Sequence, residues 1–136
     1  MSLLSPTIRT MLLANGEQSQ KLPYFDPIPL VRLFNPMGPA VWLASELHAD
    51  GNTLYGLADL GFGCPELGCF SLREIEGIRL AFGLSIERDH GFRTTHRLSF
   101  WAEAARVAHS IPDADLLLRR LERHARSARE IPPQDG

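Results

Sequence analysis

The chain has 136 residues, a mass of 15.2 kDa and a formal net charge of −2, with 44% hydrophobic and 22% charged residues. A chain of this length can bury a core of its own, so we expect a single domain over residues 1–136. The nearly balanced charge gives no overall attraction to nucleic acid or to an anionic membrane.

The N-terminal segment SLLSPTIRTMLLANG shows no export signal. Pro6, Arg9 and Thr10 interrupt its apolar residues, so it has neither the apolar region nor the cleavage pattern of a signal peptide. No apolar run in the chain approaches the length of a membrane span. Two cysteines without an export signal favour reduced thiols. We therefore expect a soluble, cytoplasmic protein.

The first expected element is a short helix within SPTIRTMLLAN. Ser5 is a typical N-cap, Pro6 suits the first helical position, and Gly16 predicts the end of the helix. The polar, proline-rich stretch that follows predicts a loop leading into the first strand.

Three strands are predicted next, over residues 30–34, 40–47 and 53–60. Each is a short, mostly apolar run bounded by turn residues. Asp50 and Gly51 lie between the last two runs and predict a tight hairpin.

Counting outward from this hairpin turn predicts that Trp42 lies opposite Asp59 and that Glu46 lies opposite Tyr55. Because strand side chains alternate, these four residues are expected to share one face. The other face is expected to be core, and its residues are Val41, Leu43, Leu47, Leu54, Ala58 and Leu60. The first face combines aromatic rings with carboxylates, which suits the binding of a ligand or partner.

A second helix is predicted to begin at Leu72. Ser71 and Glu74 have the spacing of a capping box, in which each side chain bonds to a backbone N–H of the other residue. The residues before it, around Cys69, predict a short strand. The segment 84–92 is either a final strand or an ordered loop.

Two helices are predicted at the C-terminal end. The first is LSFWAEAARVAH, with Ser99 as its N-cap. The second is DADLLLRRLERHARSAR, whose apolar stripe consists of Ala114, Leu117, Leu118, Leu121, Ala125 and Ala128. This stripe is expected to pack on the domain or on a second copy of the chain, so a homodimer through the C-terminal helix is possible.

The same helix carries the one basic patch in the sequence: Arg119, Arg120, Arg123, Arg126 and Arg129. Such a patch can bind phosphates, which makes nucleic-acid binding an alternative function. Acids at the start of a helix and arginines toward its end are also favoured by the helix dipole, so a solvated face is the simpler interpretation.

The two cysteines are separated by four residues, not by the two of a redox or zinc pair. Cys64 and Cys69 could form a zinc site with His90 and His96. Pro65 and the glycines around it are typical of a turn, so a structural corner with free thiols is the favoured interpretation.

Five carboxylates lie in and around the predicted strands: Glu46, Asp59, Glu66, Glu87 and Asp89. Paired carboxylates can perform acid–base chemistry or hold a divalent ion. The alternative is a solvated sheet face on which Arg32 or Arg88 pairs with the acids. No metal or catalytic motif sharpens the first interpretation, so we predict no catalytic residue, metal or cofactor.

Four segments, VRLFNP, WLASEL, GLADLGFGCPELGCFSLREIEGI and GLSIERD, closely resemble a family of small bacterial proteins known as domain of unknown function 2958. The resemblance spans about Leu3 to Val107. It implies a protein carried on plasmids and other mobile elements, and it implies no activity or ligand. It divides the chain into a family-like core, residues 1–110, and a C-terminal amphipathic helix and tail, residues 111–136.

From these observations we predict an α+β fold, with a small antiparallel sheet and with helices from both termini packed on one face. The predicted function is a non-enzymatic accessory protein of a mobile element that binds another protein. The predicted binding residues are Trp42, Glu46, Tyr55, Asp59, Glu66, Glu87, Arg88 and Asp89. A small enzyme or divalent-metal binder that uses the carboxylates is the second hypothesis, and nucleic-acid binding through the arginine helix is the third.

Overall fold

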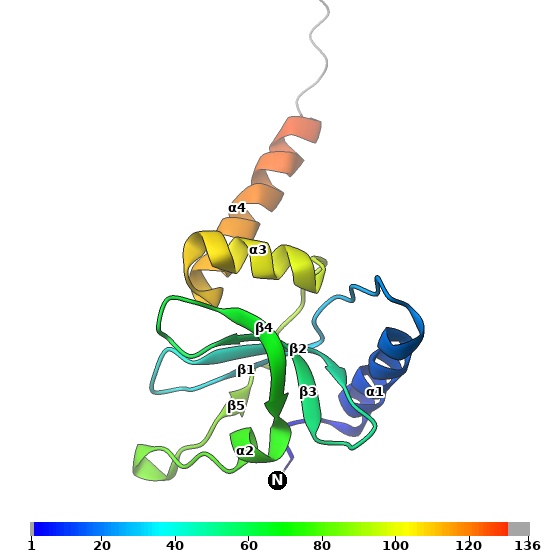
Figure 1. Ribbon diagram of the computed structural model, residues 1–136. Coiled ribbons are helices and arrows are strands. Elements are labelled where there is room, and N and C mark those ends of the chain that lie inside the picture. Colours follow the sequence, from blue (N-terminus) through cyan, green and yellow to red (C-terminus); the bar gives the residue numbers. More distant parts are fainter. Residues whose placement is uncertain (1, 131–136) are drawn as a thin grey trace, which may run out of the picture.

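The structure is a computed structural model, described here for residues 2–130, and its centre is one five-stranded antiparallel sheet of order β4-β3-β2-β1-β5 (Figure 1). The strands are β1 Val31–Phe34, β2 Val41–Leu47, β3 Thr53–Asp59, β4 Glu66–Ser71 and β5 Glu87–Arg88. The helices are α1 Pro6–Lys21, α2 Leu72–Glu76, α3 Leu98–Ala108 and α4 Ile111–Glu130, with a short 3₁₀ turn η1 at Ala81–Gly83. The predicted α+β class is confirmed. The predicted tail beyond residue 130 lies outside the described residues.

Helices cover both faces of the sheet (Figure 1). On one face, α1 contributes Leu12 to a core that contains Leu33 and Trp42. On the other face, α3 and the first half of α4 contribute Trp101 and Leu118 to a second core. The sequence predicted that the helices share one face, and this detail is wrong. All seven residues of β2 are buried, so this central strand has apolar side chains to cover on both sides.

Helix α1 begins as predicted but runs further. The Ser5 side chain accepts a hydrogen bond from the N–H of Ile8, so Ser5 is the N-cap. Gly16 does not end the helix, because it lies where α1 crosses β2: a Cβ atom there would be 2.3 Å from the carbonyl oxygen of Leu47. Gly16 is thus required for close packing.

Two side chains of α1 fasten the helix to backbone carbonyls of the sheet and its hairpin turn. Asn15 donates to the carbonyl of Ser45 at 3.0 Å, and Arg9 donates to the carbonyl of Gly51 at 2.9 Å. The helix is therefore attached to β2 beside its crossing at Gly16 and, further toward its N-terminus, to the hairpin turn.

A β-bulge at Ser45 changes the pairing predicted for the β2–β3 hairpin. Glu46 lies opposite Tyr55 as predicted, but beyond Ser45 the register shifts by one residue, so Val41 lies opposite Asp59 and Trp42 lies opposite Ala58. The predicted pairing of Trp42 with Asp59 is wrong. An extra residue in one strand of an antiparallel pair causes such a shift, and nothing in the turn sequence signals it.

Helix α2 has the predicted N-cap Ser71, but of the two bonds of the predicted capping box the structure has only the one accepted by Ser71. The N–H of Glu74 donates to the Ser71 hydroxyl at 3.2 Å, and the helix ends at Gly77. Of the segment 84–92, only Glu87 and Arg88 pair as a strand, with β1.

Helix α3 begins at Leu98, and the predicted cap Ser99 is wrong. Asp26, in the loop after α1, takes this role from outside the helix: its carboxylate accepts from the N–H of Ser99 at 3.0 Å and from the Ser99 hydroxyl. The carbonyl of Pro27 accepts from the N–H of Leu98. The first two backbone N–H groups of α3 thus have their hydrogen-bond acceptors in a segment about seventy residues earlier in the chain.

Candidate functional site

Three of the predicted binding residues lie in the interior. Trp42 is 6% exposed, Glu46 is 5% exposed and Asp59 is 1% exposed. Because of the bulge, Trp42 packs in the core under α1, whereas Tyr55 packs against the core under α3 and α4. The structure therefore does not bring these four residues onto one open face.

Asp59 holds the start of α4 in place. Its two carboxylate oxygens accept hydrogen bonds from the N–H of Ile111 at 2.8 Å and from the N–H of Gly61 at 2.9 Å. Ile111 is the first residue of α4, where backbone N–H groups lack partners within the helix and a negative charge is favourable. Asp59 thus ties the end of β3 to the helix that covers it.

Glu46 is a buried carboxyl whose pKa is raised, chiefly because burial removes it from water, while a hydrogen bond to Ser19 and the charge of His48 act in the opposite direction. Burial, with the nearby Glu46 carboxylate, also raises the pKa of Tyr55. A carboxyl with a raised pKa is a typical general base. Here burial accounts for the shift, and we assign Glu46 to the packing of the fold.

The remaining predicted residues lie at opposite edges of the sheet. Glu66 is on the edge strand β4, whereas Glu87 and Arg88 form β5 at the other edge. Asp89 follows β5, and its carboxylate is 3.5 Å from the guanidinium of Arg32. The carboxylates are thus not gathered. Among residues 2–130, no group of three or more His, Cys, Asp or Glu side chains is arranged to hold a metal ion.

A small polar hollow of about 260 Å³ lies beside Trp101, between β1 and α4, and charged side chains line it. Two of its arginines already have carboxylate partners: Arg32 pairs with Asp89, and Arg119 pairs with Asp115 at 3.2 Å. The pairing of these charges makes this hollow a weaker candidate for an anionic ligand than its arginines alone suggest.

Both cysteines are free and exposed. Cys64 lies in the loop between β3 and β4, and Cys69 lies within β4, where the sequence predicted a strand. The segment is therefore a corner between two strands, as the sequence favoured.

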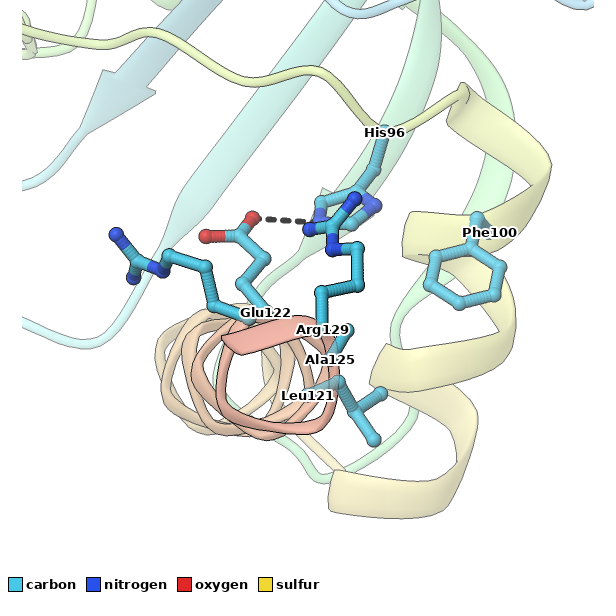
Figure 2. Close-up of a pocket in the computed structure, with 7 residues that line it drawn as sticks. His96, Phe100, Leu121, Glu122, Ala125 and Arg129 are labelled. Carbon is cyan, nitrogen blue, oxygen red and sulfur yellow. Dashed lines mark hydrogen bonds and ion pairs between the residues drawn. The ribbon is translucent and has the colours of Figure 1, made fainter. Parts of the chain in front are cut away.

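The largest change from the sequence-based expectation is a groove between α3 and α4. Figure 2 shows this hollow, of about 450 Å³, with its lining side chains drawn as sticks. One wall is formed by His96 and Phe100, and the other by one side of α4; the α4 residues are Leu121, Glu122, Ala125, Arg126 and Arg129. Phe100 was not among the predicted site residues, and His96 was considered only as a possible zinc ligand.

A polar contact connects the two walls of the α3–α4 groove. His96 Nε2 lies 2.6 Å from Glu122 Oε1, and the His96 ring stacks on Phe100 with centroids 5.2 Å apart (Figure 2). The contact fixes the position of Phe100 relative to α4. The groove is therefore formed by a stacked aromatic pair on one side and a helix surface on the other.

The apolar stripe of α4 is buried only in its first half. Ala114 and Leu118 are fully buried against the sheet, whereas Leu121 is 47% exposed and Ala125 and Ala128 are also exposed. Phe100, across the groove, is 48% exposed. In Figure 1 the second half of α4 projects away from the sheet. An apolar surface thus continues from the core into solvent.

Arginines flank this apolar surface. Between Arg119 and Arg129 the sequence has five arginines and one acid, Glu122, which contacts His96. Arg119 pairs with Asp115. The other four arginines, Arg120, Arg123, Arg126 and Arg129, form no ion pair with any side chain of residues 2–129. The predicted basic patch is thus on the surface, next to the groove.

The sequence contained one signal for this groove that the prediction did not use. Phe100 lies next to Trp101 in α3, but Trp101 faces the sheet together with Ala104 and Ala105, so Phe100 must point elsewhere. His96 could not be found from its spacing, because it lies in the loop before α3 and reaches Glu122 only after the chain folds.

The structure defines a small α+β domain whose sheet is covered on both faces and whose last helix extends beyond the body. Residues 3–112 match the model of the family described as "Protein of unknown function (DUF2958)", so the chain belongs to this family, as the resemblance indicated. The match ends within the first turn of α4. A comparison with curated proteins and one with solved structures each found no match. No helix within residues 2–130 is long and apolar enough to cross a membrane.

Proposed function

We propose that this protein is a non-enzymatic interaction module whose α3–α4 groove binds an acidic amphipathic helix of another protein. The observation that carries this proposal is the continuation of the α4 apolar stripe into solvent, beside Phe100 and between arginines. An exposed apolar groove with a charged border is typical of a protein-binding surface.

The side chains that line the groove indicate which kind of partner it binds. Leu121, Ala125 and Phe100 offer contact to apolar side chains spaced along one face of a helix, as in other helix-in-groove interactions. Arg126 and Arg129, at the border of the groove, are suited to carboxylates, because a guanidinium can donate two parallel hydrogen bonds to a carboxylate. An acidic helix with one apolar face satisfies both requirements.

The charge of α4 argues against two other occupants. A second copy of α4 would bring arginines against arginines, which costs free energy at a partly buried contact. A nucleic acid would use the arginines but would leave Leu121 and Phe100 without apolar contact. The acidic helix is therefore the occupant we propose, and nucleic-acid binding is one outcome of the test.

The test is fluorescence anisotropy with a synthetic peptide that carries leucines on one helical face and glutamates on the other. A scrambled peptide of the same composition controls for charge alone, and a short DNA duplex controls for phosphate binding. We expect Leu121→Asp to weaken binding of the amphipathic peptide about tenfold or more, because it places a carboxylate in the centre of the contact.

Two variants control for this measurement. Leu60→Asp changes an equally exposed leucine in the loop after β3, and Glu87→Lys changes a predicted binding residue on β5; neither is expected to change the affinity. Equal binding of the scrambled peptide would contradict the proposal. Tighter binding of DNA than of peptide, with a steep salt dependence, would assign the helix to nucleic acid instead.

The accessory role in a mobile element and the cytoplasmic location are part of the proposal. The resemblance described in the sequence analysis is the basis for the first, and two cysteines that form no disulfide with each other are in keeping with the second. Mapping the genes on either side of this one tests the first: a chromosomal position among housekeeping genes would contradict it.

A further inference from the structure

The outer edge of β4 is an open strand edge. β4 pairs with β3 on one side, and it is the last strand in the order β4-β3-β2-β1-β5 (Figure 1). Apart from the first turn of α2, for which Ser71 is the N-cap, no backbone hydrogen bond within residues 2–130 joins residues 66–71 to a segment other than β3. A free edge of this kind exposes N–H and C=O groups that can pair with another strand.

The ladder pattern shows which residues direct these groups outward. The N–H of Leu72 donates to the carbonyl of Asn52 at 3.0 Å, so residues 52 and 72 form a hydrogen-bonded pair at the end of the β3–β4 ladder. Hydrogen-bonded and non-hydrogen-bonded pairs alternate in an antiparallel ladder. It follows that Leu67, Cys69 and Ser71 belong to the non-bonded pairs and direct their N–H groups away from β3.

The two edges of the sheet differ in their protection. The opposite edge strand, β5, has only two residues, which is too short to attract another strand. β4 has six residues, pairs with β3 without a register shift, and contains neither proline nor lysine. Leu67 is 45% exposed and Cys69 is exposed as well. Apart from the charged Glu66 at its start, β4 therefore lacks the features that prevent an edge strand from pairing with another strand.

We propose that a second copy of this chain pairs with the outer edge of β4 in an antiparallel arrangement, with Cys69 on the two-fold axis. For hydrogen bonds to form between the two strands, residues whose backbone groups point away from β3 must lie opposite the same kind of residue in the partner strand. Of the three, Cys69 is the middle one, so placing it on the axis pairs Leu67 with the partner's Ser71 and Ser71 with the partner's Leu67. This register places all three outward-directed residues opposite a residue of the partner strand, and it joins the two sheets into one.

The side chains of β4 are complementary in this register. Gly68 lies opposite the partner's Phe70, and no atom lies within 4 Å of where a Cβ of Gly68 would be, so there is room for the ring. An aromatic ring opposite a glycine is a favourable cross-strand arrangement. Glu66 comes to the same end of the pairing as the partner's Arg73, and both are exposed and opposite in charge. By contrast, a contact between two copies of the arginine-rich α4 would bring like charges together.

Disulfide trapping tests this register directly. A hydrogen-bonded antiparallel pair has Cα atoms about 5.5 Å apart, within the ~4.4–6.8 Å that a disulfide requires. Diamide takes up the two electrons and two protons that the thiols lose. We expect the Cys64→Ser variant, which keeps Cys69, to form a covalent dimer, and the matched Cys69→Ser variant, which keeps Cys64, to remain monomeric on a non-reducing gel.

Light scattering on the untreated protein gives a second readout, with an expected mass of twice 15.2 kDa at high protein concentration. Leu67→Lys places a charge on the edge and is expected to abolish both the dimer and the cross-link. Leu60→Lys, an exposed leucine outside the strand, is expected to preserve both.

Three results would overturn the proposal. They are a monomer at every concentration with no Cys69 cross-link, equal cross-linking through Cys64, and a dimer that survives Leu67→Lys but is lost with Leu121→Asp. The last result would assign the dimer to α4. The proposal does not depend on the α3–α4 groove, so either can fail without the other.

Discussion

The two halves of α4 carry one continuous apolar stripe but have opposite environments. From Ile111 to Leu118 the apolar side chains are buried against the sheet, and Asp59 binds the first turn. From Leu121 onward the same face is exposed. The comparison shows that an amphipathic pattern identifies the apolar face of a helix but does not show how much of that face is buried.

The difference lies in what each half contacts. The first half packs against α3 and the sheet, where a buried leucine contributes about 1.5–3 kcal/mol. The second half contacts the body only through the groove that contains Phe100 and the His96–Glu122 pair. Because isolated helical turns are marginal in water, this second half gains little from tertiary packing.

Loss of the Asp59 carboxylate should have the largest effect, because it ties the first half of α4 to β3. We expect Asp59→Ala to lower the free energy of unfolding by about 3 kcal/mol, since two N–H groups lose a charged acceptor. Urea denaturation measures this. Asp50→Ala is the control: Asp50 also accepts from two backbone N–H groups, but on an exposed turn. An equal loss in both variants would contradict the role of Asp59.

A matched pair of leucines compares the two halves directly. Leu118→Ala should cost about 3 kcal/mol, because Leu118 is 1% exposed and its removal leaves a cavity. Leu121→Ala, one turn later, should cost less than about 0.5 kcal/mol, as at an ordinary surface position. Similar losses for the two would show that the second half is covered in solution.

The pH dependence of stability probes the buried layer of the sheet at Glu46. Its raised pKa means that the stability it contributes is fully present below its usual pKa of 4.5 and is lost as the pH rises through the raised value. Glu46→Gln stays neutral, so we expect this variant to exceed the native protein in melting temperature at pH 8 and to equal it near pH 4.

An exposed glutamate is the control for Glu46. The pKa of Glu103 is lowered by its hydrogen bond to Arg106, so its contribution has the opposite sign and is lost as the pH falls. Glu103→Gln should therefore leave the melting temperature at pH 8 equal or slightly lower. An identical pH profile for Glu46→Gln and the native protein would show that Glu46 is not shielded from water.

The smallest effect is expected from removing the second half of α4 altogether. A chain ending at Arg120 should lose helical circular dichroism but keep its unfolding free energy within about 1 kcal/mol, because this half adds little burial. A loss as large as that of Leu118→Ala would mean that the groove stabilises the fold.

Local signals in the sequence predicted local structure well. The Ser71 cap, the Ser5 cap and the turn at Asp50 and Gly51 each depend on residues close together in the chain, and the structure has all three. The α+β class followed from the order of these elements. Caps and turns are decided within a few residues, so one sequence is sufficient to identify them.

Features that depend on distant residues were not predictable in the same way. The bulge at Ser45 moved Trp42 to the opposite face from Asp59, and no local residue indicates it. Gly16 looked like the end of a helix because its partner, the Leu47 carbonyl, is far away in sequence. The groove likewise depends on His96 meeting Glu122 across 26 positions.

The contacts between α1 and the sheet constrain the sequence of the helix more than the sequence of the sheet. Asn15, Arg9 and Gly16 all meet backbone carbonyls, those of Ser45, Gly51 and Leu47. A carbonyl is present whatever the side chain, so the contacts made by Asn15 and Gly16 do not depend on which side chains stand at Ser45 and Leu47. Gly51 is the exception, because its φ is +71° and a Cβ atom there would be 2.7 Å from the guanidinium of Arg9. On the helix side the identity of each residue matters. The constraint that these three contacts impose should therefore fall on Arg9, Asn15 and Gly16 and, on the sheet side, on Gly51.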